Sequence, residues 1–260
     1  MKVATWNLMH AMSKRHSSPE LLDWLTAQTD VDVVVLTEAR WPKEGFTSGW
    51  SAIGTPDGLD SRRSWGTIIA GRGVELEPVT SVRGLLGAKP LRHHWPAAVH
   101  VCDVHTSSGR WGTIAGIYGV TDDLDGNKVK HGRISVPQII AELAPVIRRR
   151  KRLVLAGDLN LHPQDKPRRL EELGLVDVVE ATAASRPPLP GCAGCSMGDE
   201  CGHMWTHKNR GGRNPSAQNI DFIFASQALM PELADVRGGE QDFPDVWEMS
   251  DHAPVIASFL

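Results

Sequence analysis

The stretch LVLAGDLN, residues 153–160, decides the class of fold. Leu153 to Ala156 form an apolar run that is too short for a helix, which predicts a buried strand. Asp158 and Asn160 follow this run directly. Polar side chains at the end of a buried strand are typical of α/β proteins, where strand ends bring distant residues into one cleft.

Other apolar runs along the chain have the same character. Many strands with interspersed helices predict a layered α/β protein, although periodicity does not say how the sheets stack. Helical spacing of apolar residues is found at 19–28, with Ser18 placed to cap, and at 135–150. Strands are predicted at 2–6, 31–37, 50–53, 66–70, 99–104, 111–118, 220–225 and 254–259.

Further polar residues recur at the ends of these predicted strands. Asn7 follows the first strand, and Glu38 ends the run VDVVVLT. Asp221 lies in NIDF, and Asp251 and His252 directly precede the last strand. Each residue taken alone has a structural explanation, such as capping a turn. Taken together, they predict one cleft lined by acids, amides and an Asp-His pair.

Bulk composition is that of a globular protein. Of the 260 residues, 41% are hydrophobic and 23% are charged, and the net charge of −3 gives no overall attraction to nucleic acid. No run approaches the roughly 20 apolar residues that span a bilayer, and MKVATWNLMH does not read as a signal peptide. We therefore expect a cytoplasmic protein with no membrane association, and the sequence implies no obligate protein partner.

Six motifs in a fixed order carry a resemblance to a known family. TWN, LTEAR, IYG, GDLN, NIDFIF and SDHAP, spread over residues 3–259, resemble the endonuclease/exonuclease/phosphatase superfamily. The resemblance implies an α/β fold, namely a four-layer α-β-β-α sandwich with two mixed, mainly antiparallel sheets packed face to face. It also implies a single catalytic domain over residues 1–260, with a Cys/His-rich loop insertion at about 186–214.

The resemblance further implies a role for each motif residue. Glu38 would be the main metal ligand, with Asn7 and Asp251 close to the ion. The residues expected to take part in catalysis are Asn7, Tyr118, Asp158, Asn160, Asp221 and His252. Asp158 and Asn160 would position the attacking water and the phosphoryl group. His252, paired with Asp221, would sit against the phosphate, and Tyr118 would contact the phosphate or the leaving oxygen.

Electrostatics supports a metal at such a site. Two carboxylates about 4 Å apart repel by roughly 4 kcal/mol at an effective dielectric constant of 20. A cluster of them needs an offsetting cation. Hard oxygen ligands favour Mg²⁺ or Mn²⁺ over zinc at this site.

The stretch GCAGCSMGDECGHMWTH suggests a second metal site. Cys192, Cys195, Cys201 and His203 offer three thiolates and an imidazole, a complete tetrahedral shell for one structural Zn²⁺, with His207 as an alternative ligand. A loop of reduced cysteines or a single disulfide is the other interpretation. Cys102, alone in a predicted strand, is expected to be a small core residue.

Basic residues near this loop are candidates for substrate binding. His207, Arg210 and Arg213 precede the NIDF strand, and Arg62 lies near Trp65, a pairing that suits phosphate contact and base stacking. The sequence therefore predicts a metal-dependent phosphodiesterase whose substrate and partner is nucleic acid, DNA or RNA. Two alternatives stay open: a hydrolase of small or lipid-linked phosphate esters, and a non-catalytic, zinc-containing nucleic-acid binder.

Overall fold

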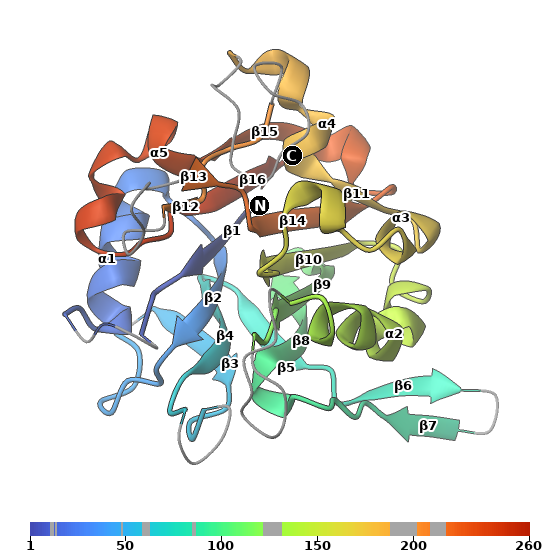
Figure 1. Ribbon diagram of the computed structural model, residues 1–260. Helices are drawn as coiled ribbons and strands as arrows, with labels where there is room; N and C mark the ends of the chain where they lie inside the picture. Colours follow the sequence, from blue (N-terminus) through green and yellow to red (C-terminus); the bar gives the residue numbers. More distant parts are fainter. Residues whose placement is uncertain are drawn as a thin grey trace.

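The protein is a sandwich of two six-stranded sheets flanked by helices (Figure 1). The computed structural model describes residues 1–10, 13, 15–47, 49–58, 63–84, 87–121, 132–187, 202–208 and 217–260. The first sheet has the order β15 (Leu233–Gly238), β16 (Val255–Phe259), β1 (Lys2–Asn7), β2 (Val33–Ala39), β4 (Gly66–Arg72) and β3 (Trp50–Gly54). The second has the order β11 (Leu175–Asp177), β14 (Asp221–Ser226), β10 (Leu153–Asp158), β9 (Gly109–Tyr118), β8 (Val99–Thr106) and β5 (Glu75–Pro78).

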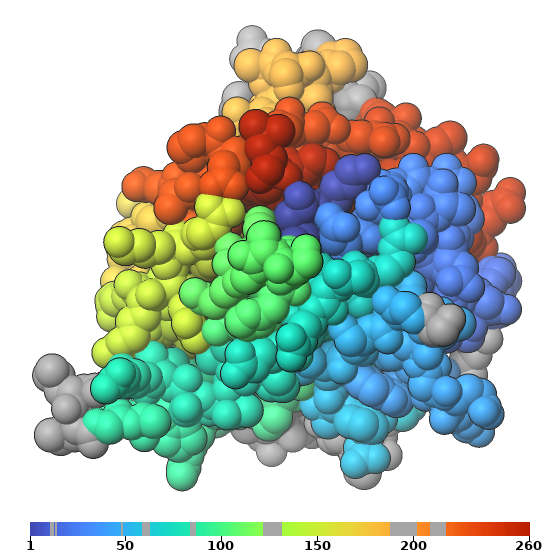
Figure 2. All heavy atoms as spheres, turned by 180° about the vertical axis from the view of Figure 1, so that it is seen from behind, coloured from blue at the N-terminus to red at the C-terminus, as the bar shows by residue number. Residues whose placement is uncertain are grey.

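Pairing within these sheets is mixed and mainly antiparallel. β1 and β2 run parallel, as do β9 and β10, and the remaining neighbours run antiparallel. The described residues also form two two-stranded sheets: β6 (Ser81–Gly84) with β7 (Gly87–Pro90), and β12 (His207–Lys208) with β13 (Ala217–Gln218). In the view from behind, the blue N-terminal segment adjoins the red C-terminal one, because β1 pairs with β16 (Figure 2).

Successive residues of each strand face opposite sides of its sheet, and this alternation separates the layers of the core. In β2, Val33 and Val35 face the second sheet and pack with residues such as Ile114, whereas Val34 and Leu36 face the opposite way. The outer face of the first sheet is covered by α1 (Ser18–Thr29), and that of the second by α2 (Ser135–Ile147). Each fully buried Val, Leu or Ile in these interfaces contributes roughly 1.5–3 kcal/mol. The predicted four-layer α-β-β-α sandwich is thus confirmed.

Short helices join the remaining elements. They are α3 (Arg169–Glu172), α4 (Val178–Ala181) and α5 (Gly239–Asp242). Within the described part of the chain, no helix is both long and apolar enough to span a lipid bilayer.

The prediction of the α1 cap is wrong by one residue. Ser17 is the N-cap: its hydroxyl accepts from the backbone N–H of Glu20, and the Glu20 carboxylate accepts from the Ser17 backbone N–H at 2.7 Å. This reciprocal pair is a capping box. Ser18 instead donates its hydroxyl to the carbonyl of Arg40 at 2.8 Å, which ties the start of α1 to the chain after β2.

Candidate active site

The carboxyl ends of β1 and β10 bring the two sheets together at one edge. Asn7 is the last residue of β1, and Asp158 is the last residue of β10. Asn7 Nδ2 donates to Asp158 Oδ2 at 2.8 Å, and both side chains are fully buried. The backbone N–H of Met9 donates to Asn7 Oδ1 at 2.8 Å, which fixes the orientation of the amide.

Asp158 is held from a second side by Asn160. The backbone N–H of Asn160 donates to Asp158 Oδ1 at 2.7 Å, and its Nδ2 donates to the carbonyl of Gly119 at 2.9 Å. Asn160 has a φ of 49°, in the left-handed region that Asn tolerates better than most residues. The motif therefore uses Asn160 both as a turn residue and as a donor to the acid.

Glu38 is presented by an irregular end of β2. The pairing of β2 with β4 shifts register between Leu36 and Ala39, and Glu38 has a φ of 46°. Such irregularities re-aim a side chain, and strained backbone of this kind clusters at functional sites. The hydroxyl of Tyr118, at the end of β9, donates to Glu38 Oε1 at 3.0 Å. Like the pair of Asn7 and Asp158, this bond joins the two sheets.

His10 supports the same turn. Its backbone N–H donates to the carbonyl of Glu38 at 3.1 Å. Its ring accepts from the Arg40 N–H at Nδ1 (3.1 Å) and contacts the His16 carbonyl through Nε2 (2.9 Å), which makes Nε2 the donor. His10 is 4% exposed, and burial lowers the pKa of its ring to about 4, so the ring holds the turn as a neutral imidazole.

Asp221 and His252 form a buried pair. His252 Nδ1 lies 2.8 Å from Asp221 Oδ2, and the two residues are 5% and 0% exposed. Ser250 accepts from the backbone N–H of His252 at 3.1 Å and donates its hydroxyl to the Asn7 carbonyl at 2.8 Å. Trp6 Nε1 donates to the His252 carbonyl at 2.8 Å. The loop before β16 is thereby tied to the end of β1.

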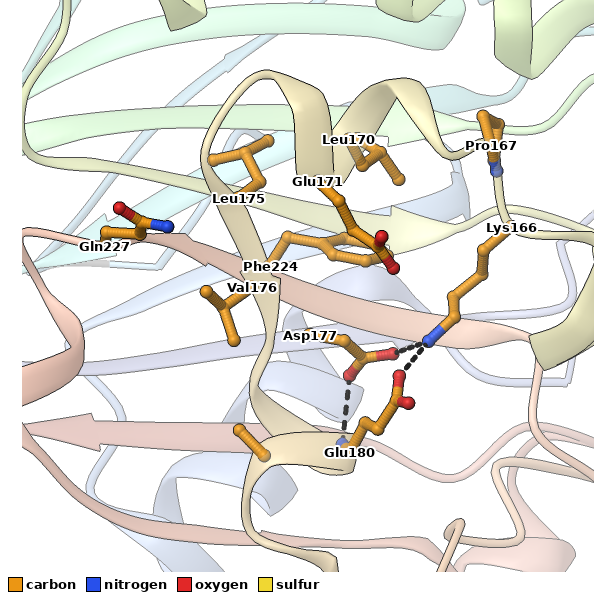
Figure 3. A pocket seen from close by; sticks show the side chains of 11 residues that line it. Lys166, Pro167, Leu170, Glu171, Leu175, Val176, Asp177, Glu180, Phe224 and Gln227 are labelled. Carbon is orange, nitrogen blue, oxygen red and sulfur yellow. Dashed lines mark hydrogen bonds and ion pairs between the residues drawn. The ribbon is translucent and has the colours of Figure 1, made fainter.

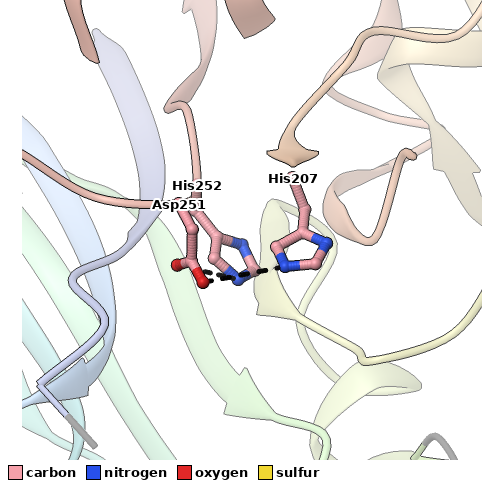
Figure 4. A group of neighbouring side chains, drawn as sticks. All are labelled: His207, Asp251 and His252. Atoms are coloured by element: carbon pink, nitrogen blue, oxygen red, sulfur yellow. Dashed lines mark ion pairs between the residues drawn. The ribbon is translucent and has the colours of Figure 1, made fainter. Parts of the chain in front are cut away.

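Asp251 and His207 lie next to His252 (Figure 4). Asp251 Oδ1 is 3.9 Å from His252 Nε2, and Asp251 Oδ2 is 3.8 Å from His207 Nε2. The rings of His207 and His252 have centroids 4.5 Å apart. Gln218 Nε2 contacts His207 Nδ1 at 2.6 Å. Burial and the charge of His252 lower the pKa of His207 to about 2, which leaves this imidazole neutral.

The charges of this cluster act strongly on one another. Burial, together with the charge of Asp221, raises the pKa of Asp158 to about 8. Burial raises the pKa of Glu38, and the charge of Asp251 acts in the same direction. Burial alone would lower the pKa of His252, but the carboxylates of Asp221, Asp158 and Asp251 raise it to about 10. His252 is therefore the cation of the cluster.

The residues present fit a divalent cation. Asp251 Oδ1 and Asp221 Oδ1 are buried and have no hydrogen-bond partner among the described residues. An unsatisfied buried carboxylate oxygen is costly, and a metal ligand role removes that cost. Glu38, Asp251 and Asn7 offer hard oxygen atoms, the set that Mg²⁺ and Mn²⁺ prefer.

Known structures share this architecture. No family model matches the sequence, and no curated protein sequence matches it. A 3′-5′ exonuclease (NExo) from Neisseria meningitidis is 20% identical with a TM-score of 0.66, and the match covers 100% of this chain and 99% of that one. An AP endonuclease from Archaeoglobus fulgidus is 16% identical with a TM-score of 0.66 over 100% and 99%. TDP2 from D. rerio, complexed with a single-strand DNA product, is 15% identical with a TM-score of 0.62 over 100% and 98%.

The chain has the endonuclease/exonuclease/phosphatase superfamily fold. The low identities make this a statement about fold. Within that superfamily fold, the residues predicted from the six motifs lie where the carboxyl ends of β1, β2, β9 and β10 meet. Their individual roles remain predictions.

The zinc prediction falls largely on residues that the structure does not describe. Cys192, Cys195 and Cys201 lie outside the described residues. His203 is described. Burial lowers the pKa of its imidazole, and the nearby charges of Asp177, Lys166, Glu180 and Arg186 have opposing effects on it. His207, the alternative zinc ligand, lies against His252 and Asp251. Cys102 is fully buried in the core between the sheets, and burial raises the pKa of its thiol to about 12.

Only some of the predicted substrate-binding residues are among those that the structure describes. Arg62, Arg210 and Arg213 lie outside the described residues. Trp65 is partly buried, and its ring meets the ring of Tyr118 edge-on, with centroids 5.3 Å apart and an interplanar angle of 84°. Trp65 therefore borders the site through Tyr118.

Several residues of the site were not found from the sequence. His10 and Gln218 each contact one predicted residue, Glu38 and His207. Ser250 contacts two, His252 and Asn7. Ser250 belongs to the SDHAP motif, so its position beside His252 was a usable signal. His10 and Gln218 act across the fold and have no local pattern.

A well-formed pocket lies away from this site (Figure 3). It has a volume of about 360 Å³ and lies beside β11, over Phe224. Lys166 Nζ, at one end, is bonded to Asp177 Oδ2 at 2.7 Å and to Glu180 Oε2 at 2.6 Å. Because its cation is already neutralised, this pocket offers little to a phosphate, and none of the predicted site residues lines it.

Proposed function

We propose that the protein hydrolyses phosphodiester bonds of DNA with the help of a divalent cation. The observation that carries this proposal is the convergence of Glu38, Asp158 and Asp251 with the pair of Asp221 and His252 at one edge of the two sheets. The related structures include a nuclease, an AP endonuclease and a protein complexed with a DNA product, which favours DNA as the substrate class.

Glu38, Asp251 and Asn7 would hold the cation. When bound, Mg²⁺ or Mn²⁺ polarises a phosphoryl oxygen and stabilises the charge that develops on it. Tyr118 keeps Glu38 in place through its hydroxyl, and His10 keeps the backbone of Glu38 in its left-handed conformation. These contacts fix the carboxylate before any ligand binds, which lowers the cost of reorganisation.

Asp158 would accept the proton of the attacking water. Asn7 and Asn160 orient its carboxylate by hydrogen bonds of 2.8 Å and 2.7 Å. Only the ionised form of Asp158 can act as a base, and positive charge in the site favours that form. Burial and the charge of Asp221 raise the pKa of Asp158, and a cation bound nearby would act in the opposite direction and favour the ionised base.

His252 would donate a hydrogen bond to the phosphoryl group. Asp221 occupies its Nδ1, so Nε2 remains for the substrate, and the raised pKa keeps the ring protonated at neutral pH. A charged donor aimed at developing negative charge is among the strongest catalytic devices. The neutral His207 beside it would donate or accept without adding charge.

A panel of substrates tests the proposal. Plasmid DNA, single-stranded DNA, duplex DNA with an abasic site, RNA and a chromogenic diester are incubated with Mg²⁺, Mn²⁺ or EDTA. We expect hydrolysis of DNA with either metal and none in EDTA. Asp158→Asn and His252→Gln should each lower kcat by about 10²–10⁴-fold. Asp23→Asn, an exposed carboxylate on α1, is the matched control.

The alternatives give different results in the same panel. A clear preference for the small diester would favour a hydrolase of small or lipid-linked esters. DNA binding without hydrolysis under any condition would favour a non-catalytic binder.

A further inference from the structure

The β6–β7 hairpin projects from the body of the protein (Figure 1). It is inserted between β5 and β8 of the second sheet. Its register pairs Val82 with Lys89 and Arg83 with Ala88. Paired residues share a face of a two-stranded ribbon, so Arg83 and Lys89 lie on opposite faces.

The base of this hairpin lies at the end of the second sheet where β9 presents Tyr118 to the candidate site. β8 is antiparallel to β9 and begins where Val99 pairs with Ile117, next to Tyr118. β5 is antiparallel to β8, so it runs toward the same edge and ends there at Pro78. The backbone N–H of Leu91 donates to the Thr80 carbonyl at 2.8 Å and closes the base of the hairpin.

Hydrophobic packing joins the base of the hairpin to the second sheet. Val79, Val82 and Leu91 pack against the hydrophobic cluster that contains Tyr118. Trp65, whose ring meets that of Tyr118, packs against the same cluster. The base of the hairpin thus packs against the same hydrophobic cluster to which Tyr118 belongs.

The charge of this arm has one sign. Residues 79–94 contain no Asp or Glu. Arg83, Lys89 and Arg92 are exposed, and none of them forms an ion pair with another residue in the described part of the chain. A solvated surface usually mixes both signs of charge. An acid-free arm at the edge of an acidic metal site is therefore a feature to explain.

We propose that the β6–β7 hairpin lies in a groove of duplex DNA, with Arg83, Lys89 and Arg92 contacting the phosphates. The proposal rests on the proposed function of the site. The major groove of B-DNA, about 12 Å wide, admits a two-stranded ribbon, and phosphates line both of its walls. Cations on both faces of the ribbon suit that arrangement. The corresponding groove of duplex RNA is too narrow and deep, and a single strand has no groove.

Binding measurements in EDTA test the arm separately from catalysis. Fluorescence anisotropy is measured with a DNA duplex, its single strand and the matching RNA duplex over a range of salt concentrations. The test variant is Arg83→Gln/Lys89→Gln/Arg92→Gln. The matched control is Arg148→Gln/Arg149→Gln/Lys151→Gln, three exposed cations that follow α2 and precede the start of β10, at the opposite edge of the sheet.

Loss of three phosphate contacts should reduce the slope of log K against log salt by about 2.7. Affinity for duplex DNA should fall about tenfold or more in the hairpin variant and stay near wild type in the control variant. The charge-preserving variant Arg83→Lys/Lys89→Arg/Arg92→Lys should bind like wild type, because charge at these positions carries the affinity. A glutamine variant with the melting temperature of the wild type excludes misfolding. Equal losses in hairpin and control variants, or equal losses for duplex DNA and duplex RNA, would overturn the proposal.

These outcomes separate the arm from the catalytic proposal. A wild-type protein that binds duplex DNA through the hairpin but hydrolyses nothing contradicts only the proposed activity. If the wild type hydrolyses DNA and the hairpin variant binds DNA as tightly as the wild type does, only the proposal about the hairpin is contradicted. Absence of any duplex binding by the wild type also overturns the proposal that the β6–β7 hairpin binds DNA.

Discussion

Asn7 and Asp158 lie at the ends of strands from different sheets and share a buried hydrogen bond of 2.8 Å. The amide gives Asp158 a donor without adding charge, so the acid keeps a fixed orientation next to Asp221. This bond connects the packing of the sandwich to the geometry of the site.

Substitution of Asn7 should therefore affect stability as well as turnover. Asn7→Ala leaves a buried carboxylate oxygen short of one donor, which costs about 1–3 kcal/mol. Asn7→Asp places a second carboxyl group at hydrogen-bond distance and should destabilise the protein further in EDTA. Urea unfolding of both variants at neutral pH provides the measurement. If Asn7→Asp were as stable as the wild type, the contact would not have the electrostatic role described above.

Substitution of Tyr118 tests whether its hydroxyl supports Glu38 or contacts the substrate. Tyr118→Phe removes the donor to Glu38 Oε1 and keeps the ring that packs on Trp65. Loss of one hydrogen bond worth about 0.5–1.5 kcal/mol should raise the metal concentration for half-maximal activity by roughly 2–13-fold. Activity measured against Mg²⁺ concentration gives this value. An unchanged half-maximal concentration with a lower kcat would indicate that the hydroxyl contacts the substrate instead.

Gly119 is required by the close approach of two backbones beneath Asp158. A Cβ at this position would lie 2.0 Å from the Leu159 carbonyl oxygen, so Gly119→Ala must displace backbone. We expect a loss of about 1–3 kcal/mol or more together with a large loss of activity. Gly112→Ala, whose Cβ would lie 3.2 Å from the nearest atom, is the milder control. Thermal unfolding of the two variants should separate them clearly, and equal melting temperatures would contradict this reading.

His100 should make stability depend on pH. Burial lowers its pKa to about 4, with a smaller effect of His93, and Thr55 Oγ1 contacts its Nε2 at 3.3 Å. In the unfolded chain a histidine has a pKa of about 6.5. Between these values the unfolded state binds more protons, so the free energy of unfolding falls as pH falls from about 6.5 toward 4.

Replacement of this histidine tests the assignment. His100→Gln should flatten the fall in stability between these pH values, as measured by urea unfolding. A ring pKa near 6.5 for His100, measured by NMR in the native protein, would contradict the prediction.

Much of the fold was predictable because the central strands are buried and apolar. VDVVVLT and LVLAGDLN identify β2 and β10, and Glu38 and Asp158 lie at the carboxyl ends of these strands. Seven strands at sheet edges or in two-stranded pairs were missed: β5, β6, β7, β11, β12, β13 and β15. All of them except β15 are two to four residues long, and Glu75–Pro78 (ELEP) and Gly87–Pro90 (GAKP) have no β-branched residues.

The finer geometry of the site depends on contacts that no local pattern encodes. The left-handed backbone of Glu38 results from a bulge against β4 and from the contact with His10. The approach of His207 to His252 depends on the bridge between the loop before β16 and the β12 strand. The Ser17 cap was accessible, since Ser17 and Glu20 have the spacing of a capping box.

Metal binding by isothermal titration calorimetry tests the central claim most directly. Acidic side chains brought together by the two sheets should bind Mn²⁺ in the wild-type protein, and Glu38→Gln should weaken that binding by about tenfold or more. Asp23→Asn should bind as the wild type does. A wild-type protein that binds no divalent cation, or a Glu38→Gln variant with unchanged affinity, would contradict the account.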